Sequence, residues 1–255
     1  MHLIGPKLTT ALGAGWDNSM NSFKHSGKLK AVTFSYDDGV TQDIRLVELL
    51  NQYGLKATFN LNSETLGTRG MLGYQGKRIS HYKIHKEDVK DLYAGHEVAV
   101  HTLNHPNLTQ LSDAEVLRQV VEDQRNLEAL VGYPVVGMAY PCGGKNHDER
   151  VANLIRENTS IQYCRTILST DSFDVQQDLY RFVPNVCHVV EFDRLMELGR
   201  NFVEMKPTEP QIFYIWGHSY EMDYHPDDWL KLEAFFKFIS NREDIFYGTN
   251  GEVFL

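Results

Sequence analysis

Short apolar runs alternate with helical patterns along almost the whole chain. Several of the runs, IFYIW among them, are apolar on both faces, which is typical of strands buried in a parallel sheet. The alternation favours successive βα units over a β-sandwich or a helix bundle. The predicted strands are 31–36, 57–61, 97–100, 135–140, 161–167, 182–187, 212–216 and 245–247, and the predicted helices are 41–53, 86–94, 112–131, 146–158, 191–205 and 226–240.

About eight strands with interleaved helices fit an α/β fold, a closed or nearly closed (β/α) barrel. The length of 255 residues suits one such barrel, and a hydrophobic content of 42% can fill its core, so we expect a single domain over residues 1–255. The segment 62–80 is predicted to be a long irregular loop with a function. Sites in such barrels lie at the C-terminal ends of the strands, so polar residues directly after predicted strands become candidates.

Charge and composition exclude several classes of function. The net charge of −9 lacks the basic surface that a phosphate backbone requires, so nucleic acid is not an expected partner. The first 19 residues contain no apolar stretch of the length of a signal peptide or membrane span, so we expect a soluble, cytoplasmic protein without a membrane partner. Three cysteines without metal-like spacing are expected to be buried thiols: Cys142, Cys164 and Cys187.

Two adjacent aspartates end the first predicted strand, in the sequence TFSYDDG at 33–39. Consecutive side chains of a strand point to opposite faces, so both carboxylates can reach one site only if the chain leaves the strand there, which Gly39 permits. Asp37 and Asp38 are therefore either a polar turn or a pair in which one carboxylate holds a metal and the other moves a proton.

Two histidine pairs have the spacing of four that places both imidazoles on one face of a helical turn. His101 and His105 follow a buried strand at the predicted catalytic rim, where they suit a divalent metal. His81 and His85 precede a polar helix start and are interpreted as surface or lid residues. Position therefore favours the first pair.

Two further strand ends carry suitable groups. Residues 139–144, AYPCGG, form a Pro and Gly turn of the kind that can aim a backbone N–H at a developing oxyanion. Residues 216–221, WGHSYE, place His218 at the mouth of the barrel, where it is a candidate general acid. One Asp with two His is a usual ligand set for an open divalent site, so the four stretches together indicate metal-assisted hydrolysis.

Taken in order, TFSYDDG, HTLNH, AYPCG and IWGHS resemble the motifs of the polysaccharide deacetylases, carbohydrate esterase family 4. The family motifs are T-F-D-D-G, H-[ST]-x-x-H, R-x-P-[YF] and an apolar segment that ends in a catalytic His. The match spans residues 31–218, and ATFNLNS resembles the second strand of the family. The resemblance implies a distorted (β/α) barrel, commonly of seven strands, with helices outside.

The resemblance also implies a metal site and a base. Asp38, His101 and His105 would hold one divalent ion, most often Zn²⁺, although other transition metals are possible. Asp37 would be the general base. Because a bound divalent ion lowers the pKa of its water toward about 7, the base need only take a proton from an already acidified nucleophile.

The remaining roles implied by the resemblance concern the acetyl group and the leaving group. The backbone N–H of Cys142 would help to hold the oxyanion, and His218 would protonate the leaving nitrogen. Trp216 would form a wall of the pocket for the acetyl methyl group. Aromatic rings at Tyr140 and Tyr220 are candidate substrate contacts, although most such rings only pack.

Two departures from the family pattern affect the site. The motif arginine that pairs with the catalytic aspartate falls at Ala139, and Arg165, at the end of the next predicted strand, is the candidate substitute. The alternative is that Arg165 binds another acid or a substrate carboxylate.

The fourth motif of the family, an Asp-Trp pattern, has no clear equivalent. Asp171, Asp174 or Glu221 could orient His218, and the sequence does not decide among them.

We therefore expect a metal-dependent hydrolase that removes N-acetyl groups from an amino sugar or a saccharide that contains one. An O-acetyl esterase or another C–N hydrolase would use the same site, and an inactive glycan-binding module would use the same barrel. The expected partner is an acetylated saccharide, and no obligate protein partner is indicated.

Overall fold

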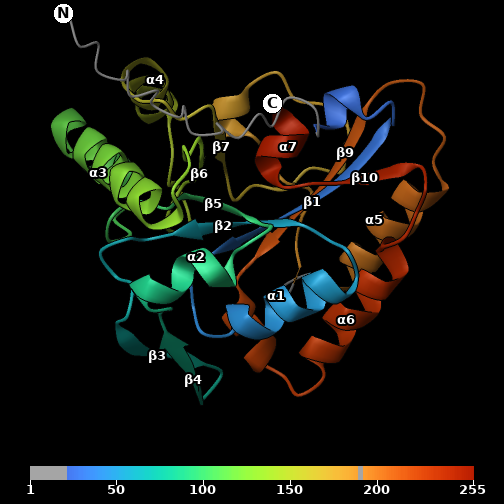
Figure 1. Cartoon of the computed structure of the whole chain (residues 1–255), viewed down its shortest axis with the longest axis horizontal. Coiled ribbons are helices and arrows are strands. Elements are labelled where there is room, and N and C mark those ends of the chain that lie inside the picture. Colours follow the sequence, from blue (N-terminus) through green and yellow to red (C-terminus); the bar gives the residue numbers. More distant parts are fainter. Residues whose placement is uncertain (1–21, 189–191) are drawn as a thin grey trace, which may run out of the picture.

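A curled sheet of parallel strands forms the centre of the protein (Figure 1). The structure is a computed structural model that describes residues 22–188 and 192–255. The strands of the sheet are β1 (Lys30–Asp37), β2 (Ala57–Leu61), β5 (Glu97–Val100), β6 (Gly137–Ala139), β7 (Tyr163–Arg165), β8 (Val186–Cys187), β9 (Gln211–Gly217) and β10 (Ile245–Tyr247). The helices are α1 (Asp43–Gln52), α2 (Val89–Leu92), α3 (Asp113–Val131), α4 (Glu149–Asn158), α5 (Phe192–Glu204), α6 (Asp228–Ile239) and α7 (Asn250–Phe254).

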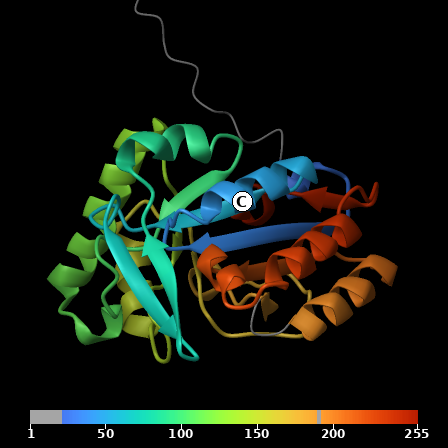
Figure 2. The same ribbon diagram turned by 90° about the horizontal axis from the view of Figure 1, so that it is seen from below.

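The strand order is β7-β6-β5-β2-β1-β9-β8, and β10 also pairs with β1. Helices lie around the outside, with α3 and α4 at one end of the sheet and α5 and α6 at the other (Figures 1 and 2). Phe182 forms a parallel bridge with Arg165 of β7, while Val186 and Cys187 pair with β9. The segment between them thus links the two edges of the sheet, which confirms the predicted α/β fold, a distorted barrel of mostly parallel strands.

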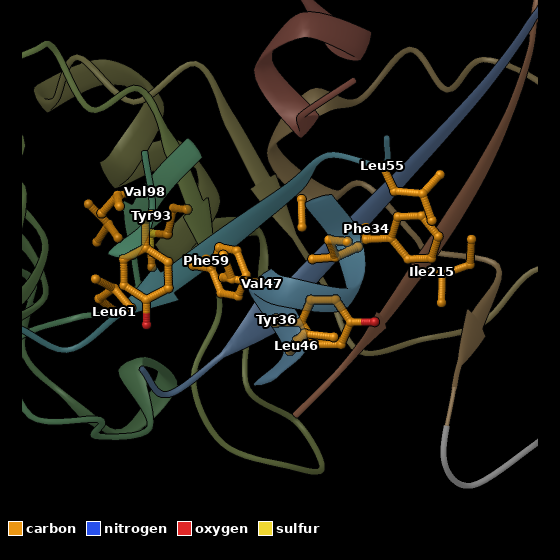
Figure 3. Close-up of a cluster of buried hydrophobic side chains, with 14 of the residues drawn as sticks. Phe34, Tyr36, Leu46, Val47, Leu55, Phe59, Leu61, Tyr93, Val98 and Ile215 are labelled. Atoms are coloured by element: carbon orange, nitrogen blue, oxygen red, sulfur yellow. The ribbon is translucent and has the colours of Figure 1, made fainter. Parts of the chain in front are cut away.

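The core explains why the central strands are apolar on both faces. Every residue of β1 and β2 is buried. In Figure 3, Phe34 and Tyr36 of β1 and Phe59 of β2 lie in one cluster with Leu46 and Val47 of α1. Burial of each such side chain contributes about 1.5–3 kcal/mol. This core fixes the positions of the strand ends that form the site.

Predictions for two segments were wrong, and one helix was missed. The expected irregular loop 62–80 contains an antiparallel hairpin, β3 (Arg69–Tyr74) and β4 (Lys77–Tyr82). Gln75 and Gly76 both have positive φ in its turn, as a two-residue type I′ connection requires. The expected strand 182–187 is a strand only at Val186–Cys187, since Pro184 offers no N–H to a ladder. Helix α7 was not predicted.

Other expectations are partly met or lie outside the described part. Within residues 22–188 and 192–255, no helix has the length and apolar character needed to cross a membrane. The reading of the first 19 residues, and residue 191 of the expected helix 191–205, lie outside the described residues. The three cysteines, which all lie among the described residues, form no disulfide; Cys164 is buried as expected, whereas Cys142 and Cys187 are only half-buried.

Candidate active site

The C-terminal ends of β1, β5, β6 and β9 surround a cleft of about 270 Å³. Nine of the ten residues singled out from the sequence line this cleft: Asp37, Asp38, His101, His105, Tyr140, Cys142, Trp216, His218 and Tyr220. The tenth, Arg165, is fully buried and contacts Asp37. The structure therefore brings all of the predicted site residues together.

Asp38, His101 and His105 offer three ligand atoms that all lie within 4.8 Å of one another. His101 Nδ1 lies 2.9 Å from the Ala139 carbonyl, a hydrogen bond that leaves Nε2 as the free ring nitrogen. Burial lowers the pKa of His101 to about 4, which keeps the imidazole neutral, as a metal ligand must be. One carboxylate and two neutral imidazoles fit a divalent ion such as Zn²⁺ and leave a coordination position open.

The backbone of the site stretches is strained. Asp38, Thr102, His105 and Cys142 all have φ between 67° and 85°, a left-handed conformation that costs a non-glycine residue about 1–3 kcal/mol. At the end of β1 this conformation lets Asp38 leave the strand, so that Asp37 and Asp38 both face the cleft. The turn continues through Gly39, whose φ is +60°.

Asp37 is buried and held by two donors. The Arg165 guanidinium forms an ion pair with Asp37 Oδ2, and Asn60 Nδ2 donates to Oδ1 at 2.8 Å. Burial raises the pKa of Asp37, but the Arg165 charge and nearby histidines outweigh it, so the pKa is lowered overall. Arg165 on β7 is the register partner of Ala139 on β6, the position of the motif arginine in the family. The guanidinium therefore reaches Asp37 from the strand next to the one that carries the arginine in the family motif.

His218 is paired with Glu221. His218 Nδ1 lies 3.3 Å from Glu221 Oε1, and Nε2 lies 4.0 Å from Asp37 Oδ2. Burial lowers the pKa of His218, but the Glu221 charge, helped by both aspartates, raises it overall to about 9. The two other acids considered from the sequence lie elsewhere, since Asp171 pairs with Arg194 and Asp174 binds Ser172 and Gln211.

The hairpin adds two site residues that the sequence did not reveal. His81 Nε2 lies 3.3 Å from Asp38 Oδ2, so of its two interpretations, as a surface residue or as a lid residue, the first was wrong. Lys83 Nζ lies 3.2 Å from Asp38 Oδ1 and donates to the Asp38 carbonyl at 2.7 Å. No motif marks Lys83, because its role depends on a hairpin that was not predicted.

The groups predicted to contact substrate differ in orientation. Among the described residues, the Cys142 backbone N–H has no hydrogen-bond acceptor. The Tyr140 hydroxyl donates to the Tyr180 carbonyl at 2.8 Å, so only its ring is left for the cleft. Tyr220 packs its ring 4.9 Å from that of His218, and Trp216 lies 5.8 Å from the same ring. The substrate contacts of these residues stay predictions.

Asp43, at the start of α1, anchors the segment that follows His218 through a hydrogen bond with Ser219. Its carboxyl is fully buried and accepts hydrogen bonds from Ser219 Oγ at 2.5 Å and Tyr93 OH at 2.7 Å. Burial raises its pKa to about 7 and Asp38 adds to this, while the two hydroxyls and Lys83 oppose it. Asp43 therefore keeps its proton in the folded protein at pH values where the unfolded chain has lost it.

This difference predicts a pH dependence of stability. Since the unfolded state binds fewer protons between about pH 4 and pH 7, the free energy of unfolding should fall as pH rises through this window. The Asp43 contribution is up to about 3 kcal/mol between pH 5 and pH 8. Urea unfolding of the wild type and Asp43→Asn at both pH values should show a smaller decrease in the variant. Equal decreases would contradict this assignment.

Comparison with known proteins agrees with the motifs. Residues 24–159, more than half of the chain, match the sequence profile of the family described as Polysaccharide deacetylase. The peptidoglycan-N-acetylglucosamine deacetylase of Listeria monocytogenes is 27% identical over 120 residues, which are 46% of this chain and 22% of that protein. The peptidoglycan-N-acetylmuramic acid deacetylase of Bacillus subtilis is 28% identical over 123 residues, 48% of this chain and 23% of that protein. The chain thus matches less than a quarter of the length of these two relatives.

Solved structures share the fold. A family 4 carbohydrate esterase from Streptomyces lividans, in complex with acetate, has a TM-score of 0.50 at 14% identity and covers 83% of this chain and 88% of its own. A CE4 family pseudoenzyme from Bacillus anthracis has a TM-score of 0.51 at 18% identity, with coverage of 89% and 66%. From the profile match and the ordered motifs, the chain belongs to the polysaccharide deacetylase family.

Proposed function

We propose that the protein is a metal-dependent hydrolase that removes N-acetyl groups from an amino sugar or from a saccharide that contains one. One observation carries the proposal: a ligand cluster, a paired carboxylate and a paired histidine converge on a single cleft. The names of the relatives, which are peptidoglycan deacetylases, support an acetylated saccharide as substrate.

Asp38, His101 and His105 would hold the ion. When bound, a divalent ion polarises an acetyl carbonyl and acidifies water. Asp37 is ionised and lies outside the ligand cluster, so it can accept a proton from the attacking water. The free N–H of Cys142 is available to donate to the oxyanion.

His218 is the acid of the proposed reaction. Its raised pKa keeps the imidazole protonated at neutral pH, so it can donate a proton to the leaving nitrogen. Without that proton an amine anion would have to depart. Glu221, which faces Nδ1, stabilises the charged imidazolium before the transfer.

An inactive glycan-binding module is the main alternative from another class. The alanine at position 139 favours it, because the motif arginine is missing there. The ion pair between Arg165 and Asp37 weighs against it, since a guanidinium occupies the expected place beside the base.

Acetate release tests the proposal. We expect the zinc-loaded protein to release acetate from N-acetylglucosamine oligomers, and Asp38→Asn, prepared in the same way, to release none. Acetylated xylan serves as the comparison substrate. Release from xylan alone would indicate an O-acetyl esterase, and release from neither substrate by a protein with bound zinc would reject the proposed activity.

A further inference from the structure

Lys83 occupies an unusual place for a lysine. Its side chain is 7% exposed, and its ammonium contacts both the carboxylate and the main-chain carbonyl of Asp38. A buried ammonium is costly to desolvate and persists only when it is paired. The carboxylate that pairs with Lys83 belongs to Asp38, the single acid of the proposed ligand cluster.

The hairpin holds Lys83 firmly in this position. Thr41 N donates to the Tyr82 carbonyl at 2.7 Å and Ile84 N donates to the Gly39 carbonyl at 2.8 Å, so the residues on both sides of Lys83 are bonded to the turn that contains Asp38. In β4, which directly precedes Lys83, buried Ile79 belongs to one hydrophobic cluster with Val40. These contacts hold the Lys83 ammonium beside the turn that contains Asp38.

The two acids of the cleft and the acid beside His218 each have a cationic partner in the metal-free protein. Asp37 pairs with Arg165, Asp38 with Lys83, and Glu221 with His218. A divalent ion that binds Asp38 must therefore share a carboxylate that already faces a positive charge. Coulomb repulsion between the ion and the ammonium opposes binding, and it is strong at a buried position.

We propose that Lys83 is an internal counter-cation of Asp38, which keeps the ligand carboxylate in place in the metal-free protein and thereby weakens metal binding. The inference rests on the proposed metal site, but not on the identity of the substrate. In thermodynamic terms, Lys83 stabilises the metal-free site more than the metal-bound site. Removal of the Lys83 charge should therefore destabilise the metal-free protein and lower the dissociation constant for the metal ion.

The dissociation constant for Zn²⁺, measured by competition with a chromophoric chelator, tests this directly. We expect Lys83→Gln to bind Zn²⁺ about 10- to 100-fold more tightly than the wild type, because the repulsion between the ammonium and the ion is removed. This change has the size of the losses that follow when other partners of metal ligands are removed, with the opposite sign. Lys83→Arg keeps the charge and should stay near the wild type. Lys77→Gln is the matched control, because Lys77 begins β4, the strand that directly precedes Lys83, and donates to the Tyr224 carbonyl instead.

Thermal unfolding supplies a second measurement. After chelation, Lys83→Gln should unfold at a lower temperature than the wild type, and Zn²⁺ should raise its unfolding temperature by more. The chelated wild type should keep its near-ultraviolet circular dichroism spectrum, which serves as the test if the variant does not fold. A chelated wild type without that spectrum would overturn the inference.

The affinity measurements separate this inference from the proposed function. A wild type that binds no Zn²⁺, or an Asp38→Asn variant with wild-type affinity, would overturn the metal site and the inference together. Zn²⁺ binding that depends on Asp38 but is equal or weaker in Lys83→Gln would overturn the inference alone.

Discussion

Asp37→Asn is expected to lower the turnover number for acetate release by about 100-fold or more and to leave the metal content unchanged. Asparagine has nearly the same shape as aspartate, so the new side chain at position 37 still fills the space beside Asn60. The amide has no carboxylate to accept a proton from water. The ligand atoms of Asp38, His101 and His105 are not altered. Acetate release and metal analysis on the same preparation measure the two effects.

Asp174→Asn is the matched control for this experiment. Asp174 is an aspartate that the sequence also placed near the site, but its carboxylate binds Ser172 and Gln211 outside the cleft. We expect that variant to keep the wild-type turnover. Acetate formed by Asp37→Asn at the wild-type rate would remove Asp37 from the role of base, even if the metal site is correct.

Strand ends were the part of the site that sequence patterns could locate. A strand that is buried on both faces must be apolar until it leaves the sheet, so the first polar residues after it mark the rim. This reasoning placed Asp37, Asp38, His101 and His218 around one cleft, where the structure has them. It also placed Arg165 beside Asp37, because neighbouring parallel strands end at the same edge.

Site residues that do not lie at the ends of the barrel strands were harder to predict. The hairpin pattern of β3 and β4 is weak, since glycines and exposed residues interrupt its alternation, and its Gln-Gly turn is less distinctive than Asn-Gly. Without the hairpin, His81 and Lys83 had no place near Asp38. Glu221 could be named but not selected, because three acids were equally compatible with the sequence.

Most errors in the predicted fold concern short helices and strands. The helix α7 has only five residues, too few for a periodic pattern, although the capping box between Thr249 and Glu252 is a local signal that could have revealed it. The predicted strand 135–140 begins two residues before β6 and ends one residue after it, and the predicted strand 161–167 extends two residues past each end of β7. Buried apolar residues continue beyond both strands, and single backbone hydrogen bonds, such as Tyr140 N to the Arg165 carbonyl, continue with them.

Arg165→Ala is expected to reduce turnover by about 100-fold while the metal content stays intact, because Asp37 then lacks the charge that keeps it ionised and oriented. The free energy of unfolding should also fall, by about 3–5 kcal/mol, since the substitution leaves a buried carboxylate without its partner. Urea unfolding and acetate release measure the two losses. Unchanged turnover would show that Arg165 does not serve the base.

Moving the guanidinium to the family position distinguishes its function from its contribution to packing. Ala139 and Arg165 are register partners on neighbouring parallel strands, so side chains at the two positions leave the sheet on the same face. In the double variant Ala139→Arg/Arg165→Ala, the charge returns to Asp37 from the next strand, and we expect turnover to exceed that of Arg165→Ala by at least about 10-fold. Ala139→Arg alone adds a second buried cation without an acid and should lower stability. Turnover that stays low in a folded double variant would mean that the base requires the particular approach from β7, and that the positive charge alone is not sufficient.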